Sequence, residues 1–102
     1  MTAARLAPAA KRDVIDATRW IAKDSPPVAR AFVDAVAKAT LMIGTHEKVG
    51  VVRTELADHP YRFLVLVGFP YVVLYNAALK PPLILRVLHG ARDLPELLGD
   101  MR

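Results

Sequence analysis

Hydrophobic residues in the first half of the chain recur with the period of an α-helix. Between Ala10 and Lys23 they lie three or four residues apart and form one stripe, with Trp20 at its edge. A second stripe has the same period and consists of Val28, Ala31, Phe32, Ala35, Val36, Ala39, Met42 and Ile43. The two stripes predict two amphipathic helices.

The junction between these helices carries local start and stop signals. Ser25 can cap the second helix, and Pro26 and Pro27 suit its first turn because their missing N–H groups are not needed there. Gly44 is expected to end this helix. Since the connection is only about four residues long, the helices are expected to form an antiparallel hairpin.

The second half of the chain has the character of β-strands. Three segments rich in aromatic and β-branched residues predict strands at 61–67, 71–76 and 83–89. The turns between them are tight and predict an antiparallel meander, because parallel neighbours need long crossovers. The fold class is therefore α+β: an N-terminal antiparallel helical hairpin packed on a small antiparallel β-sheet. Lesser expectations are a short strand near 5–7, a loop with a short extended piece at 45–60 and a helical turn at 95–99.

The predicted strands carry apolar residues on both faces, whereas a helical hairpin covers only one face of a small sheet. The other face is expected to expose an apolar patch, which would mark an interaction site. We assign to this patch Leu64, Leu66, Val72 and Leu74. The alternative is that the loop at 45–60 or the C-terminus covers this face.

Composition narrows the class of protein. Hydrophobic residues make up 54% of the 102 residues, which is above the roughly 45–50% of typical soluble domains. The longest uncharged stretch, 63–79, is interrupted by Gly68, Pro70 and Asn76 and is shorter than the roughly 20 apolar residues of a membrane helix. We therefore expect a single cytoplasmic domain, residues 1–102.

Cysteine is absent, which excludes thiolate chemistry, and the net charge of +4 favours acidic partners.

Few side chains suggest catalysis. Ser25 is the only serine and serves better as a helix cap, and Asp13 and Asp16 are expected on the solvated side of the first helix. The three histidines lack the spacing of a metal site, so neither a metal nor a cofactor is expected. Basic residues in or beside the sheet leave a ribonuclease-like site open: Arg53, Arg62, Lys80, Arg86 and Arg92.

Cleavage would also need a general acid and base, for which only Tyr71, Tyr75 or His89 is available. Their spacing singles out none of them. Arg86 is equally compatible with an ion pair to Glu55, Asp58 or Asp93.

Over nearly its whole length the chain resembles the ParE branch of the RelE/ParE toxin superfamily. The segment Trp20-Ile21-Ala22-Lys23-Asp24-Ser25-Pro26 is similar to the junction between the family's two helices, and Arg53-Thr54-Glu55-Leu56 is similar to its loop. The clearest match is the last strand with the residues that follow it, ending in His89-Gly90-Ala91-Arg92-Asp93.

This resemblance implies a toxin of a type II toxin–antitoxin system, neutralised by a cognate ParD-like antitoxin. Such toxins are described as inhibitors of DNA gyrase that act by binding and are not enzymes. The related RelE branch consists of ribosome-dependent mRNA endonucleases. Its C-terminal tyrosine has no counterpart here, because no tyrosine follows Tyr75. A degenerate toxin, retained only as an antitoxin-bound regulator, is a third alternative.

The implied partners allow candidate residues to be named. An antitoxin segment is expected to lie as an amphipathic helix along the hairpin and to add an extended piece to the sheet. Its candidate contacts are Trp20, Phe32, Arg62, Leu64, Leu66, Val72, Leu74 and Arg86. The candidate contacts to the target are Arg53, His89 and Arg92. Direct DNA binding by the toxin alone is not expected.

Overall fold

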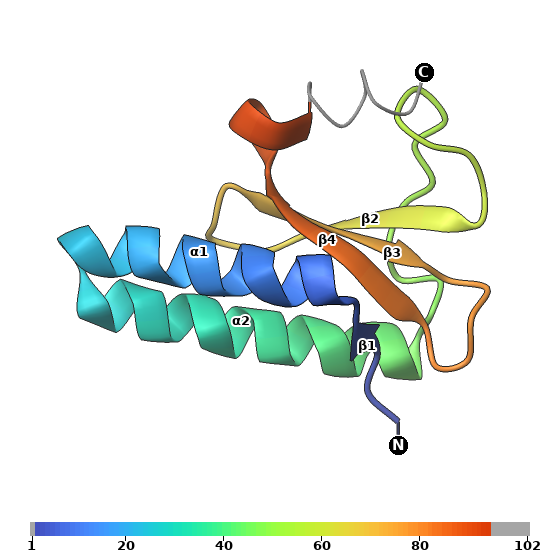
Figure 1. Cartoon of the computed structure of the whole chain (residues 1–102). Coiled ribbons are helices and arrows are strands. Elements are labelled where there is room, and N and C mark those ends of the chain that lie inside the picture. The colour runs from blue at the N-terminus through green and yellow to red at the C-terminus, as the bar shows by residue number, and fades with distance from the viewer. Residues whose placement is uncertain (1, 95–102) are drawn as a thin grey trace.

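The computed structural model describes residues 2–94, which form a two-helix hairpin against one sheet (Figure 1). The helices are α1 (Pro8–Asp24) and α2 (Pro26–Thr45). The strands are β1 (Arg5–Leu6), β2 (Tyr61–Val65), β3 (Tyr71–Asn76) and β4 (Leu83–His89). The α+β architecture predicted from the sequence is confirmed. The predicted helical turn at 95–99 lies outside the described residues, although residues 90–94 are already helical.

The four strands lie in the order β1-β4-β3-β2. The pairs β2–β3 and β3–β4 are antiparallel, as the short turns require, while β1 pairs with β4 in parallel. The sheet is therefore mixed. Strand β2, which follows the long loop after α2, forms one edge.

Local sequence signals explain the helix ends. The Ser25 hydroxyl accepts a hydrogen bond from the Val28 N–H at 3.3 Å, which confirms the predicted cap. Helix α2 runs one residue beyond the predicted stop at Gly44. Gly44 serves instead to admit the backbone of Thr2 and Ala3, since a Cβ at this position would collide with both residues.

The main core lies between the hairpin and the sheet. Its fully buried side chains include Phe32, Ile43, Val73, Tyr75 and Ile84. The Phe32 ring packs 5.4 Å from Phe69 and 5.0 Å from Tyr71, measured between ring centroids. Phe32 is therefore a core residue with no exposed surface in this chain, and its role as an antitoxin contact stays a prediction that its burial does not support.

A second, smaller core covers the opposite face of the sheet. It consists of Ala57, Phe63, Val72 and Leu74, with Leu56 and Leu94 packed against them. The predicted exposed patch is therefore wrong: Leu66, Val72 and Leu74 are buried, and Leu64 is half-buried. The covering segments are the loop and the helical turn at 90–94, which is the alternative that the sequence left open.

Strand register explains this error. Phe63 lies opposite Leu74 and Val65 lies opposite Val72, so these residues share the face away from the helices. Leu64 and Leu66 belong to the core under the hairpin. The four residues assigned to one patch therefore lie on two different faces.

Candidate functional site

An apolar groove runs between α2 and the outer edge of β2. Its volume is about 450 Å³. Helix α2 contributes small and flexible side chains, and the end of β2 with the two residues after it contributes an aliphatic run: Ala31, Asp34, Ala35, Lys38, Ala39, Met42, Leu64, Val65, Leu66 and Val67. Val65 is 62% exposed and Val67 is 91% exposed, so the rim of the groove offers apolar surface to solvent. Apart from Leu64 and Leu66, none of these residues was a candidate from the sequence.

The edge of β2 beside this groove is only partly closed. Val51 pairs with Phe63 through two backbone hydrogen bonds, of 2.8 and 2.9 Å, and so occupies the middle of the edge. By the alternation of an antiparallel ladder, the N–H and C=O of Val65 point outward in the same direction as those of Phe63. Within residues 2–94, no segment pairs with Val65 on that side. An extended chain can therefore add to the sheet at Val65.

Two side chains fasten the loop that carries Val51. The Tyr75 hydroxyl accepts a hydrogen bond from the Gly50 N–H and donates one to the Glu47 carbonyl, both at 2.8 Å. Arg62 donates to the Gly50 carbonyl at 2.7 Å. Burial raises the pKa of Tyr75, so this phenol stays protonated and can act as the donor. Arg62, a predicted partner of acidic antitoxin residues, is already used within the chain.

A polar cleft lies between the middle of α1 and the end of β4, with a volume of about 310 Å³. The Asp13 carboxylate accepts hydrogen bonds from Arg86 Nε at 2.7 Å, from the other end of the same guanidinium at 3.0 Å and from the Val87 N–H at 2.9 Å. Asp13 therefore links α1 to β4 through these hydrogen bonds, and its predicted solvated position is wrong. The hydrogen bonds that Arg86 donates to the Asp13 carboxylate raise the pKa of Arg86.

The segment His89–Asp93 forms a reciprocal helix cap beside this cleft. The Arg92 N–H donates to His89 Nδ1 at 3.2 Å, and the His89 N–H donates to the Asp93 carboxylate at 2.8 Å. The Arg92 guanidinium contacts the same carboxylate at 3.0 Å. Burial opposes ionisation of Asp93, but the hydrogen bonds from Arg92 and His89 outweigh it and lower the pKa of this carboxyl.

The remaining candidate residues are distributed between two places. Trp20, Arg86 and Arg92 line the polar cleft together, and Trp20 is 60% exposed. His89 is adjacent, with its ring 5.3 Å from that of Tyr71. Arg53 lies on the loop, in an exposed ion pair with Glu55 of 2.8 Å. The candidate target contacts thus do not line one common pocket.

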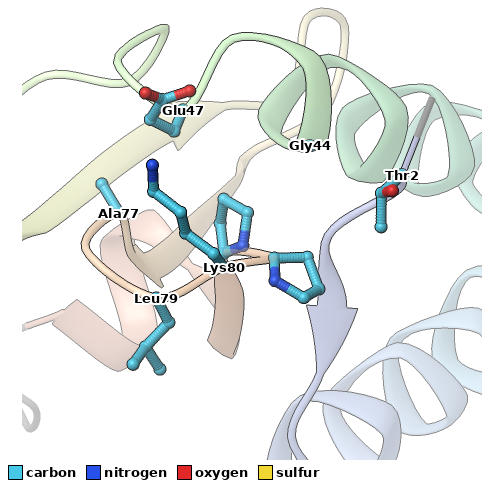
Figure 2. A pocket seen from close by; sticks show the side chains of 8 residues that line it. Thr2, Gly44, Glu47, Ala77, Leu79 and Lys80 are labelled. Carbon is cyan, nitrogen blue, oxygen red and sulfur yellow. The ribbon is translucent and has the colours of Figure 1, made fainter.

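A third hollow lies between the end of α2 and the turn that joins β3 to β4. Its volume is about 360 Å³. Figure 2 shows Lys80 extending from this turn toward Glu47, with Thr2 on the side of the N-terminal segment. Of its lining residues, only Lys80 was a candidate from the sequence, as one of the basic residues of the ribonuclease-like alternative. Within residues 2–94, no buried side-chain nitrogen or oxygen lacks a hydrogen-bond partner.

Residues 2–94 contain neither a candidate metal centre nor a candidate membrane-spanning helix. No group of three or more potential metal ligands is present, and no helix is long and apolar enough to cross a membrane.

Comparisons with known proteins agree with the fold. A solved structure titled as a chromosomal ParDE toxin–antitoxin system from P. aeruginosa superposes with a TM-score of 0.69 and 18% identity. The match covers 87% of this chain and 96% of that chain. No curated protein sequence matches. Residues 4–94 match the family described as "ParE toxin of type II toxin-antitoxin system, parDE". The chain therefore belongs to the ParE toxin family.

Proposed function

We propose that this toxin is neutralised by a ParD-like antitoxin that binds in the groove between α2 and β2. The observation that supports this proposal is the apolar groove beside an unpaired backbone position. Val67 and Val65 are exposed there, and Met42 on α2 is also exposed. Exposed aliphatic surface next to an open strand edge suits a partner segment that is part helix and part strand.

The groove also restricts the chemistry of the antitoxin segment. Ala31, Ala35 and Leu66 line it with apolar surface, so it takes apolar side chains at helical spacing. Asp34 and Lys38 line the same groove and favour an antitoxin residue of opposite charge near each. A short extended piece of the antitoxin pairs with the free N–H and C=O of Val65. The edge farther along is blocked, because Val51 already pairs with Phe63.

We further propose that the toxin acts on DNA gyrase by binding and does not cleave RNA. Gyrase is the expectation that the family resemblance supplies. The argument against cleavage is electrostatic. Arg86 and Arg92 face the polar cleft, but each is paired with a carboxylate, Asp13 or Asp93. A cleft lined by these groups and Asp16 has no excess positive charge to stabilise a phosphate.

Purified toxin would be tested in two assays run in parallel. One is DNA supercoiling by gyrase, with detection of the cleavage complex, and the other is mRNA cleavage on translating ribosomes. We expect inhibition in the first assay, relief of that inhibition by equimolar antitoxin, and no cleavage in the second. Ribosome-dependent cleavage without an effect on gyrase would assign the protein to the RelE-like alternative and overturn the proposed target.

A further inference from the structure

The outer surface of the helical hairpin exposes three aliphatic side chains. Ile15 on α1 and Val33 and Leu41 on α2 are 49%, 43% and 50% exposed. The core-facing residues of the same helices include Ala17, Phe32 and Val36. On α1, Ile15 lies two residues from the core-facing Ala17 and therefore points to another side of the helix. On α2, Val33 and Leu41 do not have the three- or four-residue spacing from Phe32 that would place them on its core-facing side. Helical geometry therefore turns these three side chains away from the sheet. We call this surface the outer hairpin face.

The exposed surface of the two helices carries predominantly positive charge. The exposed basic residues of the two helices are Lys11, Arg12, Arg19, Lys23, Arg30 and Lys38, and the exposed acidic ones are Asp16, Asp24 and Asp34. None of the six basic residues forms an ion pair within the described chain. Lys23 lies 5.1 Å from the centre of the Trp20 ring, which keeps a charge and an exposed aromatic side by side. The surface thus combines unpaired positive charge with aliphatic side chains.

We infer that the outer hairpin face is the target-binding surface of the toxin and that it receives an acidic amphipathic helix of a partner protein. This inference rests on the proposed function, since it names where the target of the toxin binds. Positive charge supplies complementarity to an acidic segment. The aliphatic side chains favour a protein over a nucleic acid, because phosphate contacts make no use of Ile15, Val33 or Leu41.

The same geometry relates target binding to neutralisation. Helix α2 presents Ala35 and Met42 to the antitoxin groove on one flank and Val33 and Leu41 to the outer hairpin face on another. Lys38 is exposed and lines the groove. An antitoxin bound in the groove therefore lies beside the outer hairpin face, neutralises part of its charge and hinders approach of the target helix.

The test compares two double charge reversals of equal size. Arg19→Glu with Arg30→Glu alters the outer hairpin face, whereas Arg5→Glu with Lys48→Glu alters exposed basic residues elsewhere. Each variant is induced at graded levels in bacteria, and growth arrest is recorded. We expect the hairpin variant to need about tenfold more toxin for arrest, a size typical of charge reversal at an interface, and the control to act like wild type. Affinity for purified antitoxin reports folding of each variant.

Growth arrest by the hairpin variant at the wild-type level would overturn the inference. If that variant also loses antitoxin affinity, Val33→Ser is tested in its place. A higher toxin requirement for growth arrest would then support the inference, and arrest at the wild-type level would overturn it. Binding of wild-type toxin to duplex DNA that is lost in the hairpin variant would assign the face to nucleic acid and also overturn it. A wild type that arrests growth without inhibiting gyrase contradicts the proposed target alone, because the growth assay still tests the surface.

Discussion

At the scale of single residues, Tyr75 connects the sheet to the loop that covers the edge of β2. Its hydroxyl is the shared partner of the Gly50 N–H and the Glu47 carbonyl. A Cβ on Gly50 would lie 2.7 Å from the Tyr75 ring, so only glycine fits against it without a shift of the ring. The side chain thus links core packing with the position of Val51.

Removal of this hydroxyl is the first prediction. Tyr75→Phe should lower the free energy of unfolding by about 1–3 kcal/mol, since it leaves the buried Gly50 N–H and the part-buried Glu47 carbonyl without their partner. Chemical denaturation measures the change. Tyr61→Phe is the matched control, because no hydrogen bond of the Tyr61 hydroxyl is present within residues 2–94 and little change is expected. Equal stability of the two variants would show that the hydroxyl contributes nothing.

Asp13 gives the second prediction. It binds Arg86 and the Val87 N–H, whereas Asp16, almost one turn later on the same helix, is exposed and makes no ion pair within the described chain. Asp13→Ala should destabilise the fold by about 1–3 kcal/mol, the range for hydrogen bonds to charged groups. Asp16→Ala should change stability by less than about 0.5 kcal/mol, as at most surface sites. Thermal unfolding measures the stability of both variants. Similar losses of stability would refute the role of Asp13 in joining α1 to β4.

The Asp93 cap gives the third prediction, a pH dependence. Because the folded state lowers the pKa of Asp93, the ionised carboxylate stabilises the fold fully above the ordinary carboxyl pKa of about 3.9. This contribution is lost as the pH falls through the lower folded-state pKa. Asp93→Asn should therefore be less stable than wild type at pH 7, and the difference should shrink in acid. A difference that stays constant from pH 7 to strongly acidic pH would contradict the cap.

At the same scale, local signals were predictable from the sequence and distant partners were not. The Ser25 cap was predicted because donor and acceptor lie three residues apart. The partner of Arg86 was not, since Asp13 lies 73 positions away and looked solvated on its own helix. Only the packing of α1 against β4 brings the two together.

At the scale of elements, the apolar stripe of α2 is wider than the sheet can cover. Phe32, Val36 and Ile43 are buried, while Ala31 and Met42, which continue the same stripe, are exposed. The uncovered flank forms one wall of the groove. The helical period therefore predicted the helix correctly. It did not predict which residues of the stripe are buried, because burial depends on where the sheet ends.

For the strands too, the pattern within one strand was predictable from the sequence, whereas the alignment between strands was not. Alternation within β2 and within β3 was visible in the sequence. The face shared by two strands depends on register, and the pairing of Phe63 with Leu74 reverses the expected grouping. Register is fixed by the turn at 68–70, where Gly68 has a φ of 87°, and this turn geometry could not be read from apolar pattern alone.

The fourth prediction concerns the groove as an element-level site. Ala35→Arg places a long charged side chain in the lining of the groove. It should weaken antitoxin binding at least about tenfold, as expected for an unpaired charge in an apolar interface. Ala37→Arg is the control, because Ala37 is exposed on the same helix and does not line the groove. Isothermal titration with purified antitoxin measures both. Equal affinities would remove the groove from the binding site.

At the scale of the whole molecule, the family motif and the proposed binding surfaces are different parts of the chain. The segment His89–Asp93, the clearest sequence resemblance, forms a helix cap that holds Leu94 near the second core. The groove and the outer hairpin face are composed mainly of alanine, valine and common charged residues that form no motif. The sequence therefore predicted the family and fold well, and the binding surfaces poorly.

Because the two surfaces lie side by side on α2, we propose that an antitoxin bound in the groove neutralises the toxin. The most direct measurement is gyrase supercoiling at a fixed inhibitory toxin concentration, titrated with antitoxin, for wild type and Ala35→Arg. We predict that antitoxin restores supercoiling near one equivalent for wild type and requires a large excess for Ala35→Arg. Restoration of both toxins at the same antitoxin concentration would contradict the account.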